Sequence, residues 1–150
     1  MPAKVLNAQT KAEFVERINR IKPDSQRKFG KLTAHEVLAH LSAAIKMSFN
    51  ELGLKDEGNI FTRSFGRWLV VYVPWPKGKI VVTPKLTPPP EKDFETERAE
   101  VIQQLDRFVK MLEETPDRTA QSPLFGCPPM TWWSKMHAKH FDHHFQQFGV

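Results

Sequence analysis

The stretch HAKHFDHHF, residues 137–145, holds four of the six histidines of the chain within eight positions near the end of a predicted helix. Successive residues of an α-helix advance by about 100°, so each side chain of this helix, which we expect over about residues 131–148, can be placed around its axis. His140 shares one face with His144 and, farther round, with His137, whereas the lysines lie away from it. The sequence therefore predicts a titratable inward face where a helix normally buries apolar side chains.

Three further segments have the apolar spacing of amphipathic helices. The first covers residues 10–22, where Thr10 and Glu13 have the spacing of a capping box. The second covers residues 33–49 and opens with the same pattern, and the third covers residues 91–114. Together with the last helix, these segments predict an all-α fold of the four-helix-bundle type.

A long crossover, residues 52–90, connects the second and third of these helices. The aromatic residues of IFTRSFGRWLVVYV, residues 60–73, recur at helical spacing, and we expect an extra helix there, although WLVVYV also has the composition of a strand. The prolines of PWPKG and TPKLTPPP follow it. They predict an extended connection that wraps over the bundle, because proline interrupts regular structure.

Composition limits the class of protein. A chain of 150 residues has the length of one domain, so we assign residues 1–150 to a single domain. A hydrophobic fraction of 40% and an aromatic fraction of 11% argue against a disordered chain. The net charge of +5 is not gathered into a basic stripe, so we expect no nucleic-acid partner. We also expect no membrane span and no signal peptide, hence a cytoplasmic protein.

The spacing of the histidines predicts a metal site. His140 and His144 are one helical turn apart, which lets two imidazoles on one face reach the same metal ion. A further ligand should come from a facing helix. His40, on the second helix, borders an apolar stripe and is surrounded by alanines that permit close helix approach. We therefore predict that His40, His140 and His144 bind a divalent metal.

Two other interpretations of these histidines stay open. A single histidine on an apolar face is most often a core residue with a hydrogen-bond partner, which describes His40 taken alone. Alternatively, the histidines pair with carboxylates and no metal binds, in which case a chelator would leave the folded protein unchanged.

His137 and Glu36 are the catalytic residues that the pattern suggests, since they are the acid or base groups that we can place near the ion. His137 could be a fourth ligand or a base that acts through a ligand, but we favour a position at the pocket mouth. For Glu36, a capping duty competes with support of His40. His143 lies on the flank of the histidine face and is expected to be a packing or surface residue, and Gln147 a buried hydrogen-bonding partner.

Cys127 is the only cysteine, so neither an intramolecular disulfide nor a thiolate zinc cluster can form. It precedes the last predicted helix, and a helix N-terminus can activate a thiol as a nucleophile. Pro128 and Pro129 intervene, and no base is paired with the thiol. We therefore favour a buried structural thiol.

Two motifs resemble the DinB/YfiT-like superfamily of metal-binding four-helix bundles. The stretch GKLTAHEVLAHLSAAIKM, residues 30–47, is similar to the superfamily's second helix, whose late histidine is a ligand. The stretch HAKHFDHHFQQFG, residues 137–149, is similar to its last helix, where a histidine pair one turn apart precedes a glutamine. The resemblance implies the same three ligands as the helix geometry.

Within that superfamily, SPLFGCPPMTWWSKMHAKHFDHHFQQFG resembles an uncharacterised bacterial branch, a domain-of-unknown-function family. That branch commonly has an acidic start to its last helix, whereas this chain has PPMTWW, so either Pro129 or Thr131 marks the start here.

Three neutral imidazoles leave coordination positions open, as in catalytic zinc sites. Imidazole ligands favour zinc or nickel over manganese or iron. The resemblance implies a metal-dependent transferase that uses a low-molecular-weight thiol, with a hydrolase as a related expectation, acting on a small-molecule substrate. The alternative is a non-catalytic metal-binding module that senses stress or a ligand. The resemblance also suggests a homodimer, for which the aromatic segment 60–75 would be the surface.

Overall fold

The computed structural model describes residues 5–79 and 83–150, and within these ranges the chain is mostly helical and contains no strand. The all-α prediction is therefore confirmed. Residues 1–4, and residues 80–82 of the predicted crossover, lie outside the described residues. The elements are α1 (Lys11–Arg20), α2 (Ala34–Met47), α3 (Ile60–Arg63), α4 (Phe65–Tyr72), the 3-10 turn η1 (Pro84–Leu86), α5 (Phe94–Glu114) and α6 (Met130–Phe148).

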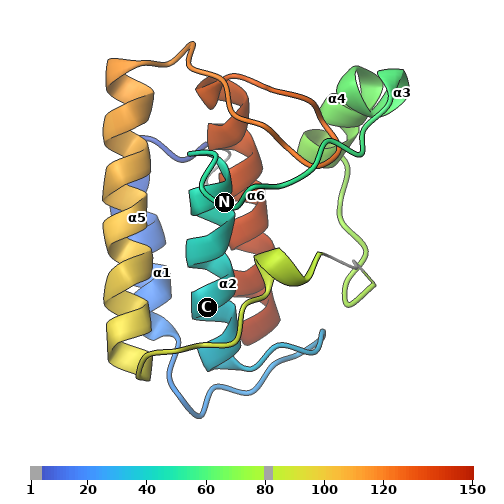
Figure 1. Cartoon of the computed structure of the whole chain (residues 1–150). Helices are drawn as coiled ribbons and strands as arrows, with labels where there is room; N and C mark the ends of the chain where they lie inside the picture. Colours follow the sequence, from blue (N-terminus) through green and yellow to red (C-terminus); the bar gives the residue numbers. More distant parts are fainter. Residues whose placement is uncertain (1–4, 80–82) are drawn as a thin grey trace.

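The four helices α1, α2, α5 and α6 lie side by side (Figure 1). Helix α5 packs against the other three, and α6 also contacts α1 and α2. Their facing sides bury one continuous apolar cluster, in agreement with the apolar spacing of these segments. The largest fully buried side chains are Trp133, Phe108, Phe141 and Phe145.

The capping box predicted at Thr10 is wrong. The Thr10 side chain does not cap α1; its hydroxyl donates instead to the Val5 carbonyl, at 2.7 Å. The side chain of Asn7 holds this turn, since its Oδ1 accepts the backbone N–H groups of Gln9 and Thr10. Asn7 thus accepts the N–H of Thr10 that the Glu13 side chain would accept in a capping box, while the N–H of Glu13 bonds the Thr10 carbonyl.

The last helix begins directly after the proline pair of residues 128 and 129. Pro129 is the N-cap of α6 and Met130 its first residue, so the start lies at Pro129 and not at Thr131. At the other end, Gly149 has φ of 70°, in the left-handed region that glycine adopts without steric cost.

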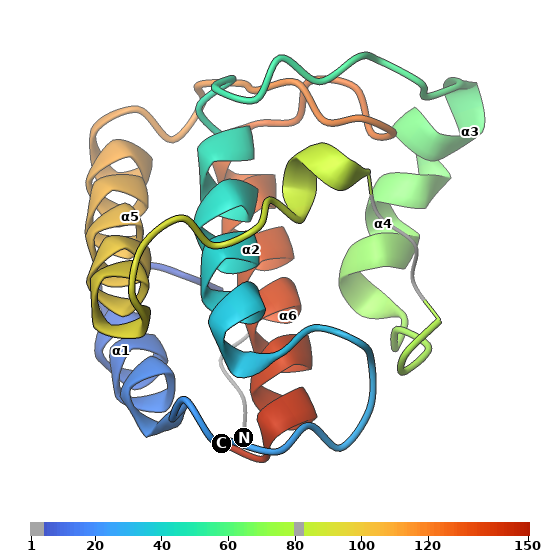
Figure 2. The same cartoon turned by 60° about the horizontal axis from the view of Figure 1, so that its bottom comes forward.

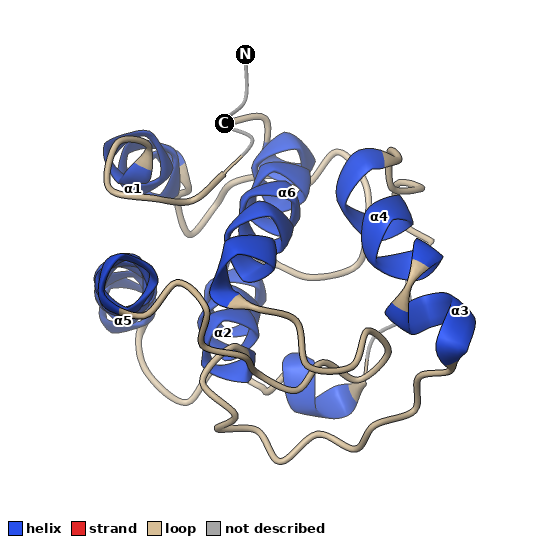
Figure 3. Cartoon of the chain, turned by 90° about the horizontal axis from the view of Figure 1, so that it is seen from above, coloured by secondary structure: helices blue, strands red, loops and turns tan. Residues whose placement is uncertain are grey.

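The extra helix predicted over residues 60–73 forms, but as two short helices that meet at Ser64. The Ser64 hydroxyl donates to the carbonyl of Ile60, at 2.6 Å, and the backbone turns there. Figure 3 shows α3 and α4 to one side of the four long helices. The outer face of this pair exposes an aromatic row whose rings follow one another: Phe61, Phe65, Trp68 and Tyr72. The homodimer expected at this surface stays a prediction.

After residue 82 the chain passes across α2 to reach the start of α5 (Figure 2). The turn η1 packs against α2 and buries Leu86. Because this connection covers a side of α2 that the other long helices leave open, most of α2 is buried. Within residues 5–79 and 83–150, no helix combines the length and the apolar character needed to cross a lipid bilayer.

Candidate metal centre

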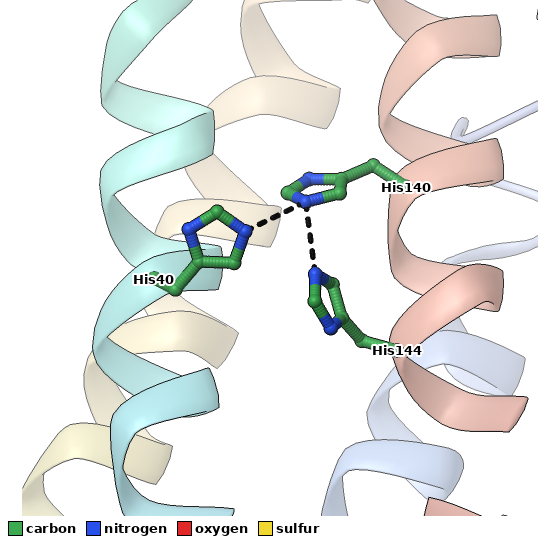
Figure 4. Close-up of side chains that lie close together, drawn as sticks. All are labelled: His40, His140 and His144. Carbon is green, nitrogen blue, oxygen red and sulfur yellow. Dashed lines mark hydrogen bonds between the residues drawn. The ribbon is translucent and has the colours of Figure 1, made fainter. Parts of the chain in front are cut away.

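Helices α2 and α6 bring the three predicted ligands together. The Nε2 atom of His40 lies 2.8 Å from the Nε2 atom of His140, which lies 3.1 Å from the Nε2 atom of His144. Figure 4 shows the three rings converging, one from α2 and two from successive turns of α6. One nitrogen from each ring lies within 4.8 Å of the other two, close enough to hold a metal ion.

The outer nitrogens of two rings are anchored by the protein. Nδ1 of His40 hydrogen-bonds the carbonyl of Leu86, in the turn η1. Nδ1 of His144 lies 2.7 Å from Oε1 of Gln147, whose amide nitrogen donates to the carbonyl of Phe29 at 2.9 Å. That second bond sets the orientation of the amide, so Oε1 faces the ring as an acceptor. Gln147 is therefore the buried hydrogen-bonding partner that the sequence predicted.

These anchors determine which nitrogens carry hydrogen. A carbonyl or amide oxygen can only accept, so Nδ1 of both His40 and His144 must donate, and in the neutral rings both Nε2 atoms are bare. Both bare nitrogens face Nε2 of His140, which carries at most one hydrogen and can satisfy only one of them. A cation among the rings would satisfy all three lone pairs.

The spacing of the nitrogens agrees with this interpretation. Ligand nitrogens about 2.0–2.1 Å from a zinc ion, at ligand–metal–ligand angles between octahedral and tetrahedral values, lie about 2.8–3.4 Å apart. The separations of 2.8 and 3.1 Å between the Nε2 atoms fall in that range. The separations between His140 and each of the other two rings thus suit a divalent ion, and the third pair, His40 with His144, lies within 4.8 Å.

Burial keeps the three rings in the form that binds metals. Removal from water lowers the pKa of His40 and lowers the pKa of His144 to about 3. Burial, reinforced by the neighbouring histidines, holds the pKa of His140 well below its usual value. None of the described hydrogen-bond partners of these rings is a carboxylate. The alternative of histidine–carboxylate pairs therefore has no support among the described residues.

His137 does not lie at the pocket mouth, so that prediction is wrong. Its side chain is 1% exposed and sits between the rings of Phe108 and Trp133. Its Nε2 lies 3.0 Å from the hydroxyl of Ser48, and burial lowers its pKa to about 3. His137 is a core residue in this structure, because its direction from the α6 axis points toward α5 and the end of α2.

Glu36 performs the capping duty. Its carboxylate accepts the backbone N–H of Thr33 at 2.8 Å, while the Thr33 hydroxyl accepts the N–H of Glu36, so the capping box predicted for this helix is confirmed. Glu36 is not among the described residues that line the cavity beside the histidines. Neither predicted acid or base therefore faces that cavity.

The cavity has a volume of about 930 Å³ and includes the three histidines in its wall. Helices α2 and α6 supply part of the wall, and α4 with the segment around Trp75 supplies another part. His143 also lines it, with its ring against the rings of Phe29 and Trp75. Burial lowers the pKa of His143. His143 was expected to be a packing or surface residue, although it directly precedes His144, one of the predicted ligands.

Cys127 is exposed, so the predicted buried thiol is wrong. Its sulfur lies 3.1 Å from Oε1 of Gln121 in the loop before α6. It is not among the described residues of the cavity wall, which leaves the nucleophile hypothesis without a geometric basis here.

These observations define the class of the molecule: an all-α protein whose buried histidine triad can hold a metal ion and borders a large cavity. A family model described as "Protein of unknown function (DUF1569)" matches residues 3–149. The chain therefore belongs to the DUF1569 family. Comparisons with curated proteins and with solved structures found no match.

Proposed function

We propose that this protein binds one divalent transition-metal ion through His40, His140 and His144, and that α1, α2, α5 and α6 form a four-helix bundle of the DinB-like type. One observation carries the metal proposal. The rings of His40 and His144 are held by hydrogen bonds at Nδ1, and both direct an Nε2 atom without hydrogen at Nε2 of His140. Zinc and nickel suit three imidazoles best, ahead of manganese and iron.

We propose that the ion serves a bound small molecule and is not a purely structural clamp. Structural zinc sites usually have four protein ligands, whereas catalytic sites have three and keep a position open. The cavity beside the triad provides room for that further ligand. Such an ion lowers the pKa of a bound thiol or water. The function that this arrangement supports best is therefore a metal-dependent transferase that uses a small thiol, or a related hydrolase.

The roles of the protein side chains in such an enzyme follow from their contacts. Leu86 and Gln147 orient the rings of His40 and His144, which limits the reorganisation needed when the ligands bind an ion. His143 and Trp75 contribute to the wall that a substrate would touch. We assign His137 a packing role in this proposal, because it is buried between Phe108 and Trp133.

A non-catalytic metal-binding module is the second candidate, and one observation favours it. The two residues expected to supply acid–base chemistry, Glu36 and His137, do not line the cavity. A sensing role needs the metal and the cavity but no proton transfer.

Elemental analysis of the untagged protein tests the metal proposal. We expect about one divalent ion per chain, lost in His40→Ala and His144→Ala. His35→Ala is the matched control, because His35 lies on α2 as well but bonds the carbonyl of Lys92 and is outside the triad. Equal metal content in all four proteins, or none in the wild type, would contradict the site.

A thiol-transfer assay separates the enzyme from the module. Metal-loaded protein is mixed with a small thiol and an aryl halide. The thiol loses its proton to the buffer, its sulfur bonds the aryl carbon, and the carbon–halogen bond breaks with release of halide. We expect halide release that disappears in His144→Ala and persists in Cys127→Ser. Metal-loaded protein that releases no more halide than buffer, across a panel of thiols, supports the module instead.

A further inference from the structure

The cavity beside the triad is apolar over most of its wall. Aromatic and aliphatic side chains from α2, α4, α6 and the adjoining segments line it, among them Phe29, Leu69, Val70, Trp75 and Met136. A wall of this kind gains free energy by removing apolar ligand surface from water. A buried sugar or nucleotide would instead leave hydroxyl and amide groups without partners, which is costly.

Charge is confined to the edge of this cavity. Among the described lining residues, the charged side chains are Lys31, Glu57 and Lys79, and all three residues are exposed to solvent. The ammonium group of Lys77 lies 5.4 Å from the centre of the Phe29 ring, which also contacts His143. Away from that edge, the titratable lining side chains are the triad and the adjacent His143, while the buried polar groups of Gln147 and Ser122 already have hydrogen-bond partners.

Because the histidine triad lies in a mostly apolar wall, we infer the class of the ligand. It is a small amphiphile that has an anionic, metal-binding head and an unbranched or aromatic apolar body. The inference rests on the proposed metal function, because three neutral rings and a divalent ion leave a net positive centre that favours an anionic oxygen or sulfur ligand. The body then extends along the apolar wall toward α4. A cavity of about 930 Å³ is at the large end of small-molecule sites, so it accommodates more than a two-carbon acid.

Cobalt-substituted protein allows a direct test, since the visible spectrum of the ion changes when a ligand enters its coordination sphere. The probes are acetohydroxamate and octanohydroxamate, which share one chelating head and differ only in chain length. Each methylene buried in an apolar environment adds about a fourfold gain in affinity. We expect octanohydroxamate to bind at least about 100-fold more tightly than acetohydroxamate, after allowance for ordering of the chain.

A pair of variants on α4 locates the binding. Val70→Trp places a large ring in the cavity wall, far along the chain from the ligands, whereas Tyr72→Trp places the same ring on the exposed outer face of the same helix. We expect Val70→Trp to reduce the preference for the longer chain to about 10-fold or less, with acetohydroxamate binding and cobalt content unchanged. Tyr72→Trp should behave as the wild type.

The outcomes separate the two proposals. A protein that takes up no cobalt overturns the metal function itself. Cobalt binding with equal affinities for the two hydroxamates overturns the amphiphile inference and leaves the metal site standing. The amphiphile inference would also be overturned if Val70→Trp is folded by circular dichroism and keeps the full preference for the longer chain. The apolar body of the ligand would then lie outside this cavity.

Discussion

His137 is a buried neutral histidine, and its neutrality makes the fold sensitive to acid. Its ring is packed against Phe108 and Trp133, and burial lowers its pKa from 6.5 to about 3. The Ser48 hydroxyl donates to the carbonyl of Ile45, so Nε2–H of His137 must donate to the Ser48 oxygen. His137→Gln keeps a donor of similar size at this position and removes the titration.

The magnitude follows from the two pKa values. The unfolded chain binds a proton on His137 below about pH 6.5, whereas the folded chain does not until about pH 3. The titration of His137 therefore does not reduce the free energy of unfolding above about pH 6.5, and reduces it progressively as the pH falls from 6.5 toward 3. Between pH 6.5 and pH 5, at about 1.4 kcal/mol for each pH unit, this one residue lowers the free energy of unfolding by about 2 kcal/mol.

The assay is urea denaturation followed by circular dichroism, in the presence of a chelator, at pH 7 and pH 5. The triad histidines titrate in both proteins, so their contribution cancels when the two pH dependences are compared. We expect the wild type to lose about 2 kcal/mol more than His137→Gln between these pH values. Losses that agree within about 0.5 kcal/mol would refute the neutral core position of His137.

Three further predictions concern single contacts. Gln147→Ala removes the hydrogen-bond acceptor of His144 and should weaken metal binding about 10- to 100-fold, measured by competition with a chromophoric chelator. The exposed control Gln146→Ala should leave the affinity unchanged. Equal affinities for the two variants would show that Gln147 has no positioning role. Arg98→Ala removes the guanidinium that donates to three carbonyls at the end of α1, and thermal or urea unfolding should show a loss of about 2–4 kcal/mol; a loss below about 1 kcal/mol would mean that water replaces these bonds. Thr33→Ala should cost about 1 kcal/mol of unfolding free energy through the lost cap of α2, and an unchanged stability would argue against that cap.

The parts of the site that sequence could predict depend on local geometry. His140 and His144 meet because residues four apart lie on one helix face, whatever surrounds the helix. His40 could be added because its neighbours on α2 mark the side that turns inward. The position of Gln147 near the azimuth of His140 likewise placed it among buried groups.

His137 and His143 show where this reasoning stopped. Each lies about 60° from His140 around the helix, on opposite sides, so the periodicity treats them alike. The structure separates them, because α5 packs on one side and the segment around Trp75 on the other. His137 therefore lies in the core and His143 in the cavity wall.

Sequence spacing alone also did not determine how the helices begin. Thr10 with Glu13 and Thr33 with Glu36 have identical spacing, yet only the second pair forms a capping box. In the first pair, the N–H of Thr10 bonds Oδ1 of Asn7 instead of the Glu13 side chain, and the Thr10 hydroxyl accepts the N–H of Asn7 and donates to the Val5 carbonyl. Competing acceptors outside a motif decide whether the motif forms.

The sequence by itself determined the helical class and the three histidines that can share an ion, because both follow from the periodicity of residues close together in the chain. Only the tertiary structure decided the protonation, the anchoring and the surroundings of those rings. The Leu86 carbonyl that orients His40 lies 46 residues away along the chain, and the Phe29 carbonyl that orients Gln147 lies 118 residues away. Burial, and with it the lowered pKa of each ring, is a property of the packed assembly of segments and not of any one helix.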